Sequence, residues 1–305
     1  MRKPIRMPRA ALRELAHDGV LSRAELREHG WDRDAVGRQV AADRWACHGR
    51  QTVALHTSTL GEEAGRWRAV WEAGERVAAL DGVSALHAAG MTGFSDDQVH
   101  VSVKHTHTVE DIDGVRVHKV IRRVAGELEL LGLPRTKPAV AAVRAAHWAL
   151  SDRQAALLLV MPVQQRLVTG VQLVEATQRV RGRTRRRLIP QLARDIADGA
   201  QSLGELDFAS LCRLRGLPEP SRQVVRRGAQ GRVYLDVRWD EADLVIEIDG
   251  AQHLWGLAAT DDQFRQNAVV LRGDRVLRMT LVGLRLAPEA FMDQVCEAHA
   301  RFRRR

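Results

Sequence analysis

The sequence predicts a multidomain α/β protein. It would have an N-terminal winged helix-turn-helix, an α+β and then helical middle segment, and a C-terminal domain with the order α-β-β-β-α-β-α. The chain has 305 residues, which is enough for two or three compact units. Helix start and stop signals are dense in the first 60 residues, and strictly alternating strands follow one another from residue 232. We expect domains at 1–60, 61–200 and 201–305.

The composition is that of a folded globular chain, with 45% hydrophobic and 28% charged residues. The longest apolar run, residues 155–163, contains Pro162 and is far shorter than the ~20 residues of a membrane span. The basic N-terminus lacks the apolar core of a secretory signal. Three widely spaced cysteines form no Cys-x-x-Cys motif. We expect a cytoplasmic protein with reduced thiols, no membrane partner and no zinc finger.

The charge distribution indicates a polyanionic partner. The net charge is +9, and the basic excess lies in residues 1–60 and 126–200, whereas 61–125 and 201–305 are near neutral. Basic regions of this kind bind phosphates and release counterions. Because nearly all the bases are arginine, codon usage is an alternative source of part of this arginine richness. We expect nucleic acid as the partner.

The first 60 residues read as three short helices. Ser22 and Glu25 form a capping box at the start of the second helix, and Asp32 caps a third helix that reaches about residue 42. Val36 and Val40 have the spacing of a buried stripe on that third helix. Helix ends of this density favour a compact trihelical unit.

Segments 45–47 and 51–55 read as a hairpin after the third helix, which completes a winged helix-turn-helix. In that geometry the third helix enters the major groove and the wing touches the DNA backbone. A trihelical protein-interaction domain is the alternative. The candidate DNA contacts are Arg33, Arg38, Gln39, Arg44 and Arg50.

Residues 19–22 through the hairpin resemble the N-terminal winged helix of AbiEi-type abortive-infection antitoxins. The resemblance implies binding to the protein's own promoter and a cognate toxin as a partner. Winged helices often dimerise on palindromic sites, so a homodimer is a further open possibility.

The middle segment contains two predicted neighbouring strands and a series of helices. Residues 99–103 alternate between apolar and polar side chains, and 115–120 is the expected partner strand. Three histidines here could be metal ligands, although polar residues on the wet face of a strand are the simpler interpretation: His105, His107 and His118. From Pro138 the pattern is helical. Residues 179–187 contain six arginines and no acid, which favours a solvated loop over the alternative of a phosphate clamp.

The C-terminal segment carries the candidate chemistry. A capping box from Ser202 to Glu205 begins a helix that ends near residue 215, and strands are expected at 222–227, 232–239 and 244–249. A helix over 260–272, a strand over 276–281 and a final helix from Pro288 follow.

Alternation places carboxylates on one face of neighbouring strands. Asp236 lies opposite the apolar face of its strand, and Glu247 and Asp249 do so on the next strand. Same-face residues on adjacent strands lie within ~5–8 Å, so Asp236 and Glu247 could share a divalent cation. Hard oxygen ligands favour Mg²⁺ or Mn²⁺. Such close acids repel one another, and we expect a metal ion, Arg238 or Arg265 to offset the repulsion.

Segments 234–236 (Tyr-Leu-Asp) and 245–253 (Val-Ile-Glu-Ile-Asp-Gly-Ala-Gln-His), followed by Asp262 and Arg265, resemble the very-short-patch-repair-endonuclease-like family of the PD-(D/E)xK superfamily. The likeness covers about residues 198–302. It implies a restriction-endonuclease-like core and metal-assisted phosphodiester hydrolysis. It also implies roles for particular residues: Asp236 and Glu247 as metal ligands, Glu205 as the acid on the first helix, and His253 in proton transfer.

The chain departs from the family pattern at one position. Asp249 stands where the general pattern has lysine, and no lysine follows Lys137. His253 or Arg265 would have to replace that lysine, or catalysis is absent. We therefore expect a DNA-binding, metal-dependent endodeoxyribonuclease. The alternative is an AbiEi-like antitoxin or repressor with an inactive nuclease fold, and RNA is a further possible substrate.

Overall fold

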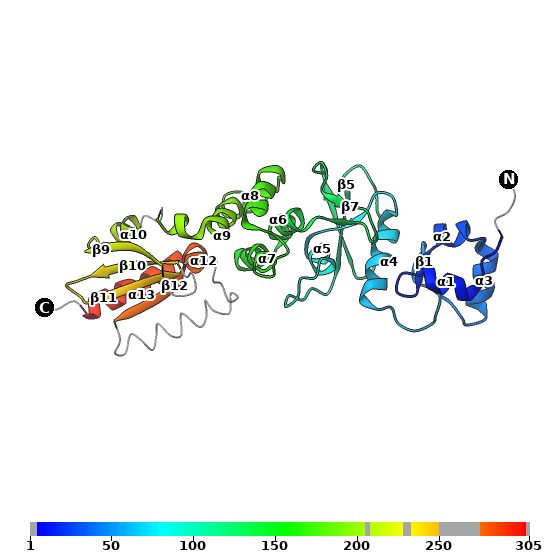
Figure 1. The fold of residues 1–305 in the computed structure, drawn as a ribbon, viewed down its shortest axis with the longest axis horizontal. Coiled ribbons are helices and arrows are strands. Elements are labelled where there is room, and N and C mark those ends of the chain that lie inside the picture. Colours follow the sequence, from blue (N-terminus) through cyan, green and yellow to red (C-terminus); the bar gives the residue numbers. More distant parts are fainter. Residues whose placement is uncertain (1–4, 205–207, 228–232, 250–274, 303–305) are drawn as a thin grey trace. The chain divides into compact units, whose positions relative to one another are not determined.

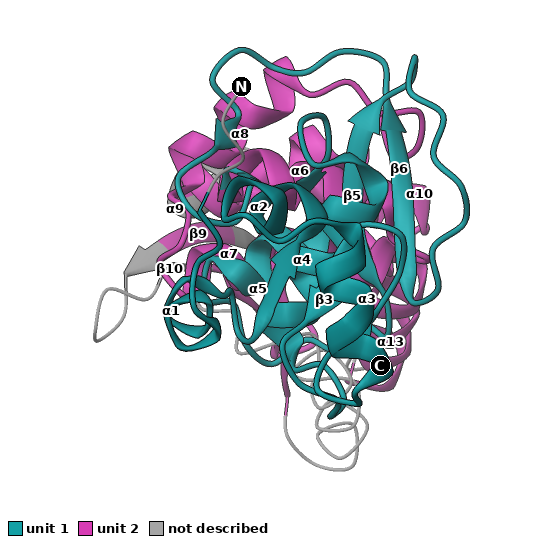
Figure 2. Cartoon of the chain, turned by 90° about the vertical axis from the view of Figure 1, so that its right-hand side faces the viewer, with its two compact units in different colours: residues 1–137 teal, residues 138–305 magenta. Residues whose placement is uncertain are grey.

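The computed structural model describes residues 5–204, 208–227, 233–249 and 275–302 (Figure 1). Within these residues the chain is a mixed α/β structure with three β-sheets. It divides into two compact units, residues 1–137 and 138–305 (Figure 2). The first unit joins the predicted N-terminal domain to part of the predicted middle segment. The reason is that helix α4 (Glu62–Gly74) packs against strands from both.

The N-terminal part of the first unit contains three helices and a small sheet whose strand order is β1-β3-β2. The pairing of β1 with β3 adds a strand that the sequence pattern did not reveal, because β1 is only three residues long. The elements are α1 (Arg9–Leu15), β1 (Val20–Ser22), α2 (Arg23–Glu28), α3 (Arg33–Ala41), β2 (Ala46–Cys47) and β3 (Thr52–Ala54).

The predicted helix caps are present. The Ser22 hydroxyl accepts from the Glu25 amide and the Glu25 carboxylate accepts from the Ser22 amide at 2.7 Å, which completes the capping box of α2. The Asp32 carboxylate accepts from the first turn of α3. The predicted buried stripe on α3 is wrong at one position: Val36 is 3% exposed, but Val40 is 36% exposed. Val40 lies in the last turn of α3, outside the apolar cluster that covers Val36.

The second part of the first unit is a five-stranded sheet with the order β6-β5-β4-β8-β7. Strands β5 and β6 are parallel neighbours with Val99 opposite Val115, so the predicted pairing of these two segments is confirmed. The elements are β4 (Ala79–Leu80), α5 (Gly82–Ala88), β5 (Val99–Lys104), β6 (Val115–Val120), β7 (Leu128–Glu129) and β8 (Arg135–Thr136).

A buried polar network joins this sheet to its loops. The Ser102 hydroxyl donates to the fully buried Asp81 carboxylate at 2.6 Å. Arg123 donates to the Ser102 hydroxyl at 2.8 Å and pairs with buried Glu127 at 3.2 Å. Buried charges are tolerated when they are paired and hydrogen-bonded in this way. The network therefore connects β5 with the segment that leads to β7.

Two histidines hydrogen-bond across β5 and β6. His118 Nε2 lies 3.0 Å from His100 Nδ1, and His100 Nε2 lies 3.3 Å from the Asp96 carboxylate. Burial, and then the nearby charges of His100 and Arg116, lower the pKa of His118 to about 3. His118 therefore pairs with His100, and the described residues contain no metal-binding group around it.

The second unit begins with four helices, α6 (Pro138–Trp148), α7 (Asp152–Gln164), α8 (Gly170–Arg179) and α9 (Leu188–Gly204). The backbone of α9 is kinked at Asp198, and the helix continues through Ser202. The predicted start of a new helix at Ser202 is therefore wrong, because that residue belongs to the end of α9. No helix among the described residues is both long and apolar enough to cross a membrane.

A four-stranded sheet with the order β12-β11-β10-β9 completes the second unit. Strand β10 is antiparallel to β9 and β11, whereas β11 and β12 are parallel. Helix α12 directly follows β12 and was not predicted. The elements are α10 (Phe208–Leu214), β9 (Arg222–Arg227), β10 (Val233–Trp239), β11 (Leu244–Asp249), β12 (Val276–Thr280), α12 (Leu281–Leu286) and α13 (Pro288–Phe302).

The buried pair of histidines predicts a pH-dependent stability of the β5–β6 sheet. The unfolded chain protonates His118 near its ordinary pKa of about 6.5, whereas the folded chain keeps it neutral until about pH 3. Stability is therefore expected to fall as the pH drops below about 6.5. Between pH 7 and 5 this side chain is expected to contribute a loss of about 2 kcal/mol to the opening free energy of β5 and β6.

Hydrogen–deuterium exchange of the β5 and β6 amides, corrected for intrinsic exchange rates, measures this free energy. The variant His118→Gln is expected to show a smaller pH dependence than the wild type. His105→Gln is the matched control, because His105 is exposed on the loop after β5. Equal pH dependence in both variants would contradict the assignment.

Candidate functional site

The sheet of the second unit buries one face of β10 and β11. Leu235 and Val237 on β10, and Ile246 and Ile248 on β11, are at most 1% exposed. They share a core with α10 and α13, which contribute Phe208, Phe291 and Val295 among others. Since successive side chains of a strand alternate between faces, the acids between these residues lie on the opposite face.

The two predicted metal-binding carboxylates are direct cross-strand neighbours. Asp236 is opposite Glu247 in the antiparallel register of β10 and β11, and both side chains are half-buried. Asp249, also half-buried, lies two residues further along β11, opposite Tyr234. The alternation in the sequence therefore predicted correctly which acids meet on this face.

Arg278 is the residue of this site that the sequence reasoning missed. It lies opposite Glu247 in the parallel register of β11 and β12, and its Nε is 2.8 Å from Glu247 Oε2. The hydrogen bond and charge of Glu247, and then the charge of Asp249, raise the pKa of Arg278. The sequence pattern could have revealed Arg278, because it alternates with the apolar residues Leu277 and Met279. Both of these neighbours are fully buried.

One of the groups expected to offset the repulsion between the acids is engaged elsewhere. Arg238 pairs with Asp240 at 2.7 Å and with Asp243 at 3.4 Å, at the turn after β10. Like charges on directly opposed strand positions destabilise a sheet. Arg278 reduces that repulsion at Glu247.

The donor atoms suit a hard divalent cation. Asp236 and Glu247 supply carboxylate oxygens from adjacent strands, and Mg²⁺ is usually held by one or two carboxylates together with water. The described residues contain no group of three or more histidine, cysteine or acidic side chains that could hold a metal ion. Three other predicted site residues lie outside the described residues: Glu205, His253 and Arg265.

The predicted DNA-contacting residues of α3 divide into two groups. Arg33 and Arg38 are exposed on the helix, and Arg44 is exposed just beyond its end. Gln39 is only partly exposed, and its side-chain carbonyl oxygen is buried without a hydrogen-bond partner. The structure therefore presents the three arginines to solvent and turns the amide oxygen of Gln39 inward.

The hairpin that follows α3 is held by a carboxylate of α4. Glu72 accepts hydrogen bonds at 2.9 Å from the amides of Arg50, Gln51 and Thr52, and at 2.7 Å from the Thr52 hydroxyl. Three successive amides around one anion form a nest. Gly49 has φ +136°, and a Cβ there would lie 2.4 Å from the Glu72 carboxyl carbon. The hairpin therefore needs glycine at this position to close on Glu72.

This anchoring leaves the Arg50 side chain at the tip of the hairpin. Its guanidinium is largely exposed and pairs with Glu110 at 3.0 Å. Arg68 of α4 donates to the His48 carbonyl at 2.7 Å and to the Asp113 carbonyl at 3.0 Å. The hairpin, α4 and the loop between β5 and β6 are thus tied together within the first unit.

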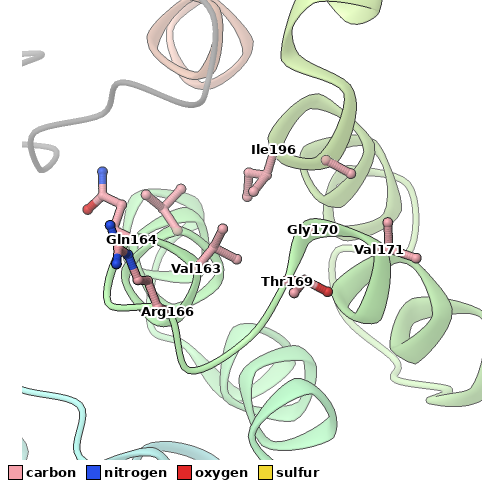
Figure 3. Close-up of a pocket in the computed structure, with 9 residues that line it drawn as sticks. Val163, Gln164, Arg166, Thr169, Gly170, Val171 and Ile196 are labelled. Atoms are coloured by element: carbon pink, nitrogen blue, oxygen red, sulfur yellow. The ribbon is translucent and has the colours of Figure 1, made fainter. Parts of the chain in front are cut away.

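A hollow of about 380 Å³ lies among α7, α8 and α9. Figure 3 shows Val163 and Ile196 on opposite sides of it, with Gln164 and Arg166 beside Val163. Its lining includes Thr169 and Gly170 but no acid, histidine or cysteine. Among the described residues it therefore offers no group for acid–base chemistry or metal binding, unlike the face of β10 and β11.

No protein-family model matches the chain, and no curated protein matches it.

The nest around Glu72 predicts that one substitution loosens the hairpin. Glu72→Ala removes the acceptor of three amides and one hydroxyl, and an unmade hydrogen bond at a partly buried site costs about 1–3 kcal/mol. We expect the amides of residues 50–52 to exchange with deuterium at least about tenfold faster. Hydrogen–deuterium exchange with peptide resolution measures this.

Glu63→Ala is the matched control, since Glu63 is an exposed glutamate on the same helix. It is expected to leave exchange in residues 50–52 unchanged. An equal effect of the two substitutions, or none for Glu72→Ala, would show that the nest does not hold the hairpin.

Proposed function

We propose that this chain is a DNA-binding protein whose C-terminal domain hydrolyses phosphodiester bonds with Mg²⁺ or Mn²⁺. The observation that carries the proposal is the direct pairing of Asp236 with Glu247 on the face of the sheet opposite its apolar core. Two acids opposite each other repel, and a divalent cation between them would offset this repulsion in addition to what Arg278 does at Glu247. A nuclease core of the PD-(D/E)xK type, with β10 and β11 as its acid-bearing strands, explains why they are there.

Each residue of this site has a proposed role. Asp236 and Glu247 would hold the cation, which would supply Lewis-acid stabilisation of phosphate charge. Arg278 holds the Glu247 carboxylate in an ion pair that a bound cation would have to displace. His253 is proposed for proton transfer and Arg265 or His253 for the role of the missing lysine, on the strength of the family resemblance.

The N-terminal part supports the DNA-binding half of the proposal. Three helices followed by a hairpin, with the strand order β1-β3-β2, are the elements of a winged helix-turn-helix. Helix α3 would enter the major groove with Arg33 and Arg38, and Arg50 on the wing would contact the backbone. Arg44, which is exposed just beyond the end of α3, would contact phosphate.

One observation favours a second candidate function. The Glu247 carboxylate is already engaged by the Arg278 guanidinium at 2.8 Å, and Asp249 stands at the lysine position of the general motif. A degenerate nuclease fold could retain this ion pair without binding metal, because fold alone does not confer activity. The chain would then be an AbiEi-like antitoxin or transcriptional repressor, with a toxin or a second copy as its protein partner.

Cleavage of DNA separates the two functions. The wild type is expected to cut supercoiled, mismatched or single-stranded DNA with Mg²⁺ or Mn²⁺ but not with EDTA, as measured by gel electrophoresis. Asp236→Asn and Glu247→Gln keep the side-chain volume but remove one of the two charged ligands proposed to hold the cation. Each is expected to lower the rate on the order of 100-fold or more, because the cation would stabilise the charge of the transition state.

Asp240→Asn is the matched control, because Asp240 is an exposed acid at the far end of β10. It is expected to retain activity. If the wild type is inert with every substrate and metal but retards DNA in a gel, the repressor function replaces the nuclease.

A further inference from the structure

The loop between α8 and α9 carries a dense positive charge. Residues 179–187 include six arginines and no acid. They connect the end of α8 at Arg179 to the start of α9 at Leu188. Neither the winged helix nor the carboxylate face accounts for this segment.

Several contacts hold the loop in one conformation on α6 and α7. Arg185 Nε donates to the Asp152 carboxylate at 2.7 Å, and Arg185 itself has φ +51°. His147 donates to the Thr184 carbonyl at 2.7 Å, and the Thr184 hydroxyl donates to the His147 carbonyl. A Cβ on Gly182 would lie 2.2 Å from the His147 ring. A left-handed non-glycine residue and such close packing are maintained only where the surroundings define the backbone.

Four other arginines of the loop are exposed, and among the described residues their guanidinium groups make no ion pair or hydrogen bond: Arg181, Arg183, Arg186 and Arg187. By contrast, six other arginines of the same unit pair with acids. Those paired arginines are Arg213, Arg215, Arg238, Arg275, Arg278 and Arg285. The loop therefore combines a fixed backbone with four exposed guanidinium groups that no acid neutralises among the described residues.

We infer that this loop is a second DNA-contacting surface that binds the phosphate backbone of duplex DNA without sequence preference. Guanidinium groups pair with phosphate oxygens through two parallel hydrogen bonds. The loop contains no aromatic side chain that could stack on an unpaired base. A fixed spacing of charges favours a regular polyanion such as duplex DNA over the fluid headgroups of a membrane. The inference rests on the proposed function, in that the same chain binds DNA through its first unit.

The salt dependence of DNA binding measures how many phosphate contacts the loop arginines make. Each phosphate contact contributes about −0.9 to the slope of log K against log salt concentration. Four contacts would contribute about −3.6. Removing them is expected to make the slope less steep by about 2–4 and to weaken binding at 150 mM salt by at least about tenfold.

The test uses the full-length chain and a fluorescently labelled 30-base-pair duplex of arbitrary sequence, with binding measured by anisotropy between 50 and 300 mM salt. The loop variant replaces the four exposed arginines with glutamine (R181Q, R183Q, R186Q and R187Q). The matched control removes the same charge from four exposed arginines elsewhere: R76Q, R122Q, R166Q and R194Q. A third variant with lysine at the four loop positions keeps the charge and is expected to restore the slope.

The inference is supported if the loop variant loses slope and affinity while the control loses less than half as much. It is overturned if the two variants behave alike, or if the loop variant loses binding to phosphatidylserine vesicles or to RNA but not to DNA. Arg33→Gln with Arg38→Gln separates this result from the proposed function. If that pair weakens binding and the loop variant does not, the winged helix stands and the loop assignment fails. If the wild type binds no DNA, both proposals fail.

Discussion

The sheet of the second unit can bury only one face of β10 and β11, and this constraint determines which side chains meet on the other. Leucine, valine and isoleucine alternate with charged residues, so packing the apolar set against α10 and α13 moves the acids to the opposite face. A shift of the register by one residue would bury Asp236 and Glu247 and expose Val237 and Ile246. The position of the acids is therefore a consequence of the core, and Arg278 follows from the same rule on β12.

The first unit depends on a different device, a helix shared by two sheets. Helix α4 packs against β1 and β3, which precede it in the sequence, and against β4 and β5, which follow it. It also holds the hairpin through Glu72, and His17 stacks on Trp67 of α4 at 3.8 Å. The hairpin is thus fixed by contacts that lie far from it in sequence. A DNA-contacting wing supported in this way would need little ordering on binding, which lowers the entropic cost of the complex.

Local rules explain what the sequence could predict, and long-range contacts explain what it could not. The caps at Ser22 and Asp32 and the alternation around Asp236 and Glu247 depend on neighbouring residues, and they are present. Val40 has the spacing of a buried residue, but its exposure depends on where the core ends. The Asp81, Ser102 and Arg123 network joins residues more than twenty positions apart, and no local pattern reveals it. Arg278 was predictable from alternation, yet its contact with Glu247 required the parallel pairing of β11 and β12.

Binding of Mn²⁺ to the full-length chain, followed by electron paramagnetic resonance, tests most directly the proposal that Asp236 and Glu247 together form a cation site. We predict saturable binding that is lost in Asp236→Asn and in Glu247→Gln and kept in Asp240→Asn. We also predict tighter binding in Arg278→Met, because the guanidinium that competes for Glu247 is removed. Absence of saturable binding in the wild type, or equal binding in all the variants, would contradict this proposal.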